Sequence, residues 1–362
     1  MPTVLILGAG KIGSLIGAFL AGTEEYTVHL ADIEPPANQQ KPSQSQTPPI
    51  THAVLDATNA EALERYVKQH QPEAVISSLP YYCNPTVAEV ARNHDLHYFD
   101  LTEDVGVTER IERISRGSQK AFVPQCGLAP GFISIVANEL MQHFDTLDIV
   151  KMRVGALPIN PSNALKYSLT WSTDGLINEY GNVCYGVENG VKTALMPLEG
   201  YETIEVDGLL YEAFNTSGGL GTLADTYSGK VQTMNYKTLR YPGHCEKIHF
   251  LMIDLKLNAQ REILKHILEN AIPKTYQDVV LIYVSVVGQK AGELIEENYV
   301  KKIYPETIAG RLWSAIQVTT AAGLCSVVDC VFAEPQRYRG FIKQETFALP
   351  DILANRFGRY YA

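Results

Sequence analysis

Residues 2–22 read PTVLILGAGKIGSLIGAFLAG, and this stretch decides the fold of the N-terminal part of the chain. An apolar run, VLIL, enters a glycine-rich turn, and apolar side chains then recur at helical spacing. A buried strand, a tight turn and a helix in this order form the opening unit of a parallel sheet that is covered by helices. The sequence therefore predicts an α/β domain at the N-terminus.

The glycines of this turn form the pattern GxGxxG. The first glycine permits a tight turn, the second lets a pyrophosphate approach the backbone, and the third allows the helix to pack closely. Asp32 ends the next strand, where its carboxylate can accept hydrogen bonds from ribose hydroxyls and would repel a 2′-phosphate. We therefore predict a dinucleotide site that takes NAD rather than NADP. Its expected contacts are Gly8, Gly10, Lys11, Ile12, Gly13 and Asp32.

Strand and helix patterns continue to alternate after this unit, which predicts a doubly wound parallel (Rossmann) sheet. Strands are expected near HAVLDA (52–57), AVISSLP (74–80), HYFDL (97–101) and KAFVPQC (120–126), and helices over 59–69, 85–94 and 108–118. Segment 34–50 is rich in proline and polar residues and predicts a surface loop. The SSLP segment ends the fourth strand at the ligand-binding edge, so we expect Ser78, Leu79 and Pro80 beside the nicotinamide ribose.

Beyond about residue 131 the alternation stops, which predicts a second, α+β domain for catalysis and substrate binding. The strand-like runs are KMRVGAL (151–157), EVDGLLYEAF (205–214), YKTLRY (236–241), HFLMIDL (249–255) and VVLIYVSVVG (279–288). A long helix is expected through 313–332 and an amphipathic helix over 348–358. The predicted boundaries are 1–130 for the dinucleotide domain, 131–325 for the second domain, and 326–362 for a C-terminal segment.

Composition excludes several classes of function. A formal net charge of −10 argues against nucleic-acid and anionic-membrane partners. No apolar run approaches the roughly 20 residues of a membrane helix, and no secretory signal is evident, so we expect a cytoplasmic protein. The six cysteines form no CxxC pair, which favours reduced thiols and no metal site. Apolar strands in the second domain suggest a homodimer.

Six motifs carry a resemblance to a known family. They are GAGKIG (8–13), LDAT (55–58), SSLP (77–80), YFDLTED (98–104), CGLAPG (126–131) and TLRYPGH (238–244). With these, the chain resembles the saccharopine dehydrogenase family, which includes saccharopine reductases and lysine 6-dehydrogenases. The resemblance implies that the C-terminal segment returns to the nucleotide domain, and that the reaction is oxidation of a carbon–nitrogen bond in a lysine-derived amino acid. It also adds Asp56 and Ala57 to the expected cofactor contacts.

Three residues are expected to carry the chemistry. Arg240 can grip a substrate carboxylate with two parallel hydrogen bonds, although an ion pair within the protein would also explain it. Asp100 ends a strand at the ligand-binding edge. Nearby carboxylates and partial burial can raise its pKa until it serves as a general base. The alternative is that Asp100 caps a helix. His244 can relay protons at neutral pH, or it is structural.

Further substrate contacts are expected from residues near these motifs. Lys166 is a possible second carboxylate anchor, and Tyr241 lies next to Arg240. Cys126 can line the pocket, although a buried structural cysteine is the simpler interpretation.

The sequence leaves three functions open. The first is cleavage of saccharopine to glutamate and aminoadipate semialdehyde, and the second is oxidative deamination of the lysine side-chain amine. A pocket rich in arginine or lysine would favour saccharopine, and an acidic pocket would favour lysine. The third is a non-catalytic NAD-binding protein, because a fold alone does not prove activity.

Overall fold

The computed structural model describes residues 1–35 and 50–362, and these fall into two compact units. The first unit contains residues 1–127, 320–360 and 362, and the second contains residues 128–319 and 361. The sequence placed the corresponding boundaries after residues 130 and 325. Most of segment 34–50, predicted as a surface loop, lies outside the described residues.

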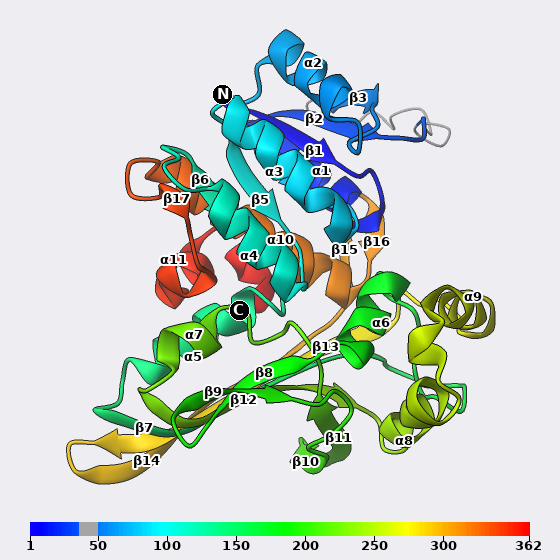
Figure 1. Ribbon diagram of the computed structural model, residues 1–362, viewed down its shortest axis with the longest axis vertical. Helices are drawn as coiled ribbons and strands as arrows, with labels where there is room; N and C mark the ends of the chain where they lie inside the picture. The colour runs from blue at the N-terminus through cyan, green and yellow to red at the C-terminus, as the bar shows by residue number, and fades with distance from the viewer. Residues whose placement is uncertain (36–49) are drawn as a thin grey trace. The chain divides into compact units, whose positions relative to one another are not determined.

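The first unit contains a seven-stranded parallel sheet (Figure 1). Its strands are β1 (Thr3–Leu7), β2 (Thr27–Asp32), β3 (Thr51–Val54), β4 (Ala74–Ser77), β5 (His97–Asp100), β6 (Ala121–Val123) and β17 (Gly340–Phe341). Their order is β17-β6-β5-β4-β1-β2-β3. Strands β1 to β6 follow the doubly wound order with its switch between β1 and β4, and β17 extends one edge. The predicted Rossmann fold is confirmed.

Helices connect these strands as predicted. They are α1 (Lys11–Ala21), α2 (Ala60–His70), α3 (Asn84–Asn93) and α4 (Val105–Ile114), with a short 3₁₀ turn η1 (Tyr81–Cys83) before α3. Side-chain caps fix two of the starts: Asn59 accepts the amide hydrogen of Ala62, and Asp104 accepts that of Val107. Apolar residues of α2, α3 and α4 share one core cluster with the sheet. Together these helices bury one face of the sheet.

The C-terminal segment supplies α10 (Ala315–Ala333), η4 (Gln344–Thr346), α11 (Leu349–Ala354) and η5 (Gly358–Tyr361). The expected amphipathic helix over 348–358 is shorter than predicted, because Asn355 leaves the helical region of backbone space. The expectation that no apolar run approaches the length of a membrane helix was wrong. By length and composition α10 could cross a membrane, but 72% of its most apolar window is buried inside the protein. That burial is typical of a core helix.

The second unit contains a mixed sheet of eight strands. They are β7 (Thr146–Pro158), β8 (Cys184–Glu188), β9 (Val191–Leu195), β10 (Glu202–Val206), β11 (Leu209–Asn215), β12 (Val231–Arg240), β13 (Asp278–Lys290) and β14 (Glu293–Ile303). The main order is β10-β11-β12-β7-β13-β14, and β8 joins β12 and β9. Only β12 and β7 pair in parallel, so the predicted loss of βα alternation is confirmed.

The remaining elements of this unit are mostly helical. They are α5 (Phe132–Met141), α6 (Thr173–Gly181), α7 (Leu223–Tyr227), α8 (His244–His249), η2 (Phe250–Asp254), η3 (Leu257–Ala259), α9 (Arg261–Ala271) and the small strands β15 (Glu306–Ile308) and β16 (Arg311–Trp313). Apolar residues of α6, α8 and α9 form a common core with Phe214 of β11. Arg240, at the end of β12, hydrogen-bonds to Tyr180 of α6.

One predicted strand is helical. HFLMIDL (249–255) continues α8 into the π-helical turn η2. Ile248 and Met252 lie four residues apart and are both buried, which is a helical period, whereas Phe250 and Ile253 are exposed. The apolar composition of the run suggested a strand, but the packing follows the helical period.

Candidate functional site

The glycine-rich turn joins β1 to α1 in the first unit. Gly8 has φ of +97°, and a side chain there would meet the carbonyl oxygen of Ser78 at 2.7 Å. A Cβ on Gly13 would lie 1.8 Å from the carbonyl oxygen of Gly8. Both positions therefore require glycine. Gly8 has a positive φ and lies too close to a backbone oxygen for a side chain, and Gly13 lies too close to a backbone oxygen.

Gly10 differs from Gly8 and Gly13 because the space around it is open. A Cβ built on this residue meets no atom of residues 1–35 and 50–362 within 4 Å. Among the same residues, no side chain caps the start of α1 at Gly10. An open approach to uncapped amides fits a dinucleotide pyrophosphate. Lys11 and Ile12 begin this helix, and their contacts with a cofactor stay predictions.

Asp32 lies at the carboxyl end of β2, beside the same turn. Its Oδ2 atom accepts the amide hydrogen of Ala9 at 2.6 Å, and Oδ1 accepts that of Glu34 at 3.2 Å. The carboxylate thereby tightens the glycine-rich turn and remains at the edge where a ribose would bind. The sequence suggested only the second of these roles.

The other predicted cofactor residues lie at neighbouring strand ends. The amide of Ser78 donates to the carbonyl oxygen of Leu7 at 2.8 Å, which places the SSLP segment directly beside the turn. After β3, Asp56 accepts the amide and hydroxyl hydrogens of Thr58 at 2.9 and 2.6 Å, and these bonds lower the pKa of Asp56. Roles for Asp56, Ala57, Leu79 and Pro80 in cofactor binding stay predictions.

Asp100 ends β5 and is completely buried. Its carboxylate accepts hydrogen bonds from the Tyr98 hydroxyl at 2.7 Å, the Thr102 amide at 2.9 Å and the Gln125 amide at 3.0 Å. Burial raises the pKa of Asp100 to about 6, although the three hydrogen bonds oppose the shift. The side chain is therefore charged at neutral pH but can be protonated in mild acid. Its catalytic role stays a prediction.

Cys126 lies next to Asp100 and is also buried. Its backbone amide donates to the Asp100 carbonyl oxygen, and its thiol donates to that of Val123 at 3.0 Å. Gln344 of the C-terminal segment donates to the Pro124 carbonyl oxygen at 2.8 Å and reaches the Cys126 sulfur at 3.4 Å. Burial raises the pKa of the thiol well above its usual value, so the thiol is neutral. No motif in the sequence indicated a role for Gln344.

Arg240 ends β12 in the second unit and is 3% exposed. Nε donates to the Tyr180 hydroxyl at 2.9 Å, and Nη1 donates to the Thr238 hydroxyl at 2.6 Å and the Leu239 carbonyl oxygen at 2.8 Å. Nη2 lies 4.0 Å from a carboxylate oxygen of Glu179. Three of the five N–H donors are thus committed, and Nη2 has only the long ion pair with Glu179.

His244 shares the hydroxyl of Tyr180 with Arg240. Its Nε2 atom lies 3.0 Å from that hydroxyl, and Nδ1 lies 2.8 Å from the carbonyl oxygen of Leu165. Since Tyr180 accepts from Arg240, it donates to Nε2, and Nδ1 of His244 carries the proton. Burial, with the charge of Arg240, lowers the pKa of His244 to about 3, so the ring is neutral at pH 7. In this structure it holds Tyr180, and proton relay stays a prediction.

The remaining predicted substrate residues flank this cluster. Lys166 is exposed and donates to the Pro242 carbonyl oxygen at 3.1 Å. Tyr241 stacks on Tyr211 and donates to the Pro158 carbonyl oxygen at 3.0 Å. Substrate binding by either residue stays a prediction.

Sequence reasoning missed most partners of Arg240. Tyr180 and Glu179 lie about sixty residues earlier, on α6, and no local pattern links them to β12. Thr238 could have been found, since residues two apart on a strand share a face.

A second group of buried cations was also missed. Arg153 and Lys237 both contact Glu202, at 2.6 and 2.9 Å. Lys237 lies three residues from Arg240 on the same strand, so the two side chains point to opposite faces of the sheet.

Two segments of the chain match one family of known proteins. Residues 4–122 match the saccharopine dehydrogenase NADP binding domain, and residues 127–359 match the saccharopine dehydrogenase C-terminal domain. The second match alone covers more than half of the chain. The chain belongs to the saccharopine dehydrogenase family. The resemblance predicted from the six motifs is confirmed, and the first unit is a nicotinamide dinucleotide binding domain.

A curated member of the saccharopine dehydrogenase family is similar in sequence. Saccharopine dehydrogenase (NADP+, L-glutamate-forming) of Schizosaccharomyces pombe is 22% identical over 265 residues. The match covers 70% of this chain and 57% of that protein. This chain therefore spans little more than half the length of that relative.

Solved structures of two other proteins share the fold. Apo saccharopine dehydrogenase (L-Glu forming) from Saccharomyces cerevisiae superposes with a TM-score of 0.76 at 16% identity, covering 97% of this chain and 95% of the yeast chain. Homospermidine synthase from Legionella pneumophila, solved in complex with NAD, gives 0.67 at 13% identity, covering 99% of this chain and 89% of its own. The predicted fold class is confirmed.

Proposed function

We propose that this protein is an NAD-dependent oxidoreductase that cleaves saccharopine with release of L-glutamate. Family membership and the name of the fission-yeast relative support the reaction class. The observation that carries the proposal is the buried guanidinium of Arg240, whose Nη2 has only a long ion pair with Glu179 and could bind a substrate carboxylate. Saccharopine has three carboxylates, and a buried arginine is a suitable anchor for one of them.

The hydrogen bonds that Arg240 already makes within the protein limit how it would hold that carboxylate. The sequence suggested a fork of two parallel hydrogen bonds, but Nε and Nη1 are already bonded to the protein. Nη2 would therefore bind one carboxylate oxygen, while Tyr180 and Thr238 hold the guanidinium plane in place. The anchor is charge-assisted and rigid, so it can fix the orientation of the substrate.

The reaction also needs a group that accepts protons. Oxidation removes a hydride from the carbon next to nitrogen, which the nicotinamide accepts when bound, and water must then add to the resulting iminium before the carbon–nitrogen bond breaks. Asp100 is our candidate base, because its pKa of about 6 leaves it ionised yet basic near neutral pH. Its burial means that protons would have to reach it through neighbouring groups.

For the cofactor we propose NAD. The carboxylate of Asp32 stands at the end of β2 and would repel a 2′-phosphate. The names of the matching family domain and of the fission-yeast relative point instead to NADP, whereas the Legionella homospermidine synthase was solved with NAD. The cofactors named for these relatives thus differ, and the negative charge of Asp32 favours NAD.

One observation favours a second function. Glu179 is 7% exposed and lies beside Arg240, so this region carries a buried carboxylate as well as a cation. A carboxylate there could hold an ammonium group, which lysine offers at its side chain. Lysine 6-dehydrogenase activity is therefore the alternative.

The test is NADH formation by purified protein with NAD, using saccharopine and L-lysine in separate reactions. The proposal expects turnover of saccharopine and little turnover of lysine. Turnover of lysine alone would replace it with the alternative. No turnover of either substrate, with NAD still bound, would support a non-catalytic NAD-binding protein.

A further inference from the structure

A cavity of about 690 Å³ lies within the first unit, away from the glycine-rich turn. Its lining includes Pro2, Glu25, Glu73, His97 and Lys120, which precede or begin strands β1, β2, β4, β5 and β6. The strands are parallel, so these residues lie at the amino edge of the sheet, whereas the turn lies at the carboxyl edge. The volume is in the range of small-molecule sites.

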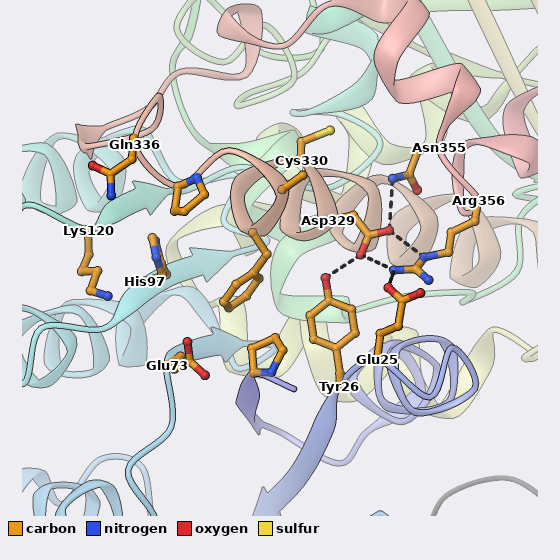
Figure 2. Close-up of a pocket in the computed structure, with 14 residues that line it drawn as sticks. Glu25, Tyr26, Glu73, His97, Lys120, Asp329, Cys330, Gln336, Asn355 and Arg356 are labelled. Carbon is orange, nitrogen blue, oxygen red and sulfur yellow. Dashed lines mark hydrogen bonds and ion pairs between the residues drawn. The ribbon is translucent and has the colours of Figure 1, made fainter.

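At one end of the cavity, the polar side chains bond to one another. Figure 2 shows Asp329 of α10 at the centre of a hydrogen-bonded cluster. Asp329 accepts from the Tyr26 hydroxyl at 2.5 Å, from Arg356 at 2.7 and 3.0 Å, and from Asn355 at 3.1 Å. Arg356 also pairs with Glu25 at 2.7 Å. These groups have protein partners and need no ligand.

The polar side chains at the other end make fewer bonds to the described part of the protein. Figure 2 shows Lys120, His97, Glu73 and Gln336 gathered there. His97 is 3% exposed, and its Nδ1 atom accepts the amide hydrogen of Ala121 at 3.0 Å. This bond fixes the neutral tautomer with hydrogen on Nε2, and Nε2 has no hydrogen-bond partner among residues 1–35 and 50–362. This N–H donor belongs to a residue that lines the cavity, so an acceptor that enters the cavity can bind it.

This end of the cavity carries one positive side chain, Lys120, and one negative side chain, Glu73. Among the described residues Lys120 forms no ion pair, and neither does Glu73. Burial and the charge of Lys120 lower the pKa of His97 to about 4, so the ring is neutral at pH 7 and keeps its Nε2 hydrogen. The end thus offers two donors, His97 and Lys120, and one carboxylate, Glu73. The ring of Phe332 packs against His97 and adds apolar surface.

We infer that this cavity binds a small zwitterionic α-amino acid. Its carboxylate would accept hydrogen bonds from His97 Nε2 and Lys120, its ammonium group would pair with Glu73, and its side chain would lie on Phe332. Such a ligand offers an acceptor to the imidazole donor and matches both charges, which a simple anion or an amine would not do. The site is separate from Arg240 and does not depend on the proposed activity.

The test uses L-norleucine as the probe and the histidine side chains as the readout. In ¹⁵N-labelled protein, the His97 ring nitrogens are assigned by their loss in His97→Asn, whose amide oxygen can still accept the Ala121 hydrogen. We expect norleucine to shift the His97 Nε2 resonance. Hexanoate, which lacks the ammonium group, should shift it only at much higher concentration, and hexylamine should not shift it.

Variants separate this site from any other that binds amino acids. Lys120→Ala should weaken norleucine binding about tenfold or more, because a charge-assisted hydrogen bond is lost. Lys68→Ala is the matched control: Lys68 is a 63% exposed lysine of the same unit, and its removal should leave affinity unchanged. An unshifted His97 resonance, an affinity that Lys120→Ala does not alter, or equal binding of hexanoate would overturn the inference.

Discussion

The glycine-rich turn of the first unit and the Arg240 cluster of the second are built in opposite ways. The turn is made by backbone atoms of consecutive residues, and a single carboxylate, Asp32, braces it. The cluster depends on side chains from three separated segments, among them Tyr180 and His244. The backbone site has no room for added atoms at Gly8 and Gly13, whereas a side-chain site tolerates substitution by degrees. Five predictions follow from this contrast, and the largest effects are expected at the first unit.

Gly13→Ala should have the largest effect. Its Cβ would lie 1.8 Å from a backbone oxygen, so the turn must move. We expect a loss of about 1–3 kcal/mol in the free energy of unfolding and no detectable NAD binding. Gly10→Ala is the control: its Cβ meets no atom within 4 Å, so stability should hold while affinity falls. Thermal unfolding and cofactor titration measure both, and normal NAD affinity in Gly13→Ala would contradict the assignment.

Asp100→Asn should lower kcat by about 10²–10⁴-fold if Asp100 is the base. The active form is the carboxylate, so wild-type kcat/KM should rise as pH increases through about 6, the pKa to which burial raises this group. The Asn variant should lose that limb of the profile. Full activity and an unchanged pH profile in the variant would leave Asp100 with a structural role only.

Arg240→Lys should lower kcat/KM for saccharopine by about 10–100-fold, because a lysine cannot keep the bonds to Tyr180 and Thr238 while reaching a carboxylate. Most of the change should appear in KM. The control is Arg110→Lys, which alters an exposed ion pair with Glu89 and should leave kinetics unchanged. Wild-type kinetics in Arg240→Lys would make the cluster purely structural.

Asp32→Ala should weaken NAD about tenfold and raise the affinity for NADP relative to NAD, because the charge that repels a 2′-phosphate is removed. The fold should survive, since the Ala9 amide that Asp32 accepts can be hydrated at this half-buried position. Isothermal titration with both cofactors measures the change. A wild-type protein that prefers NADP would reverse the cofactor proposal.

Tyr180→Phe should have the smallest effect. It removes the hydroxyl that links Arg240 to His244 and leaves the ring packing in place. We expect about 1–2 kcal/mol lower stability and a several-fold rise in KM for saccharopine. An equal fall in kcat without any change in KM would mean that the network acts in the chemical step rather than in binding.

The same contrast explains what the sequence could predict. GxGxxG and Asp32 are local signals, since glycine spacing reports backbone geometry directly, and the strand order follows from βα alternation. Arg240 and Asp100 were found because each lies in a short motif at a strand end. Tyr180, Glu179 and Gln344 were not, because their contacts join segments far apart in the chain. The run HFLMIDL was wrongly predicted to be a strand, because apolar composition alone does not distinguish a strand from a helix.

The most direct test of the proposed function is the product stoichiometry of saccharopine oxidation by the purified protein with NAD. The account predicts one L-glutamate released for each NADH formed, with no ammonia. Formation of NADH with ammonia from lysine, or no NADH from saccharopine under conditions where NAD binds, would contradict it.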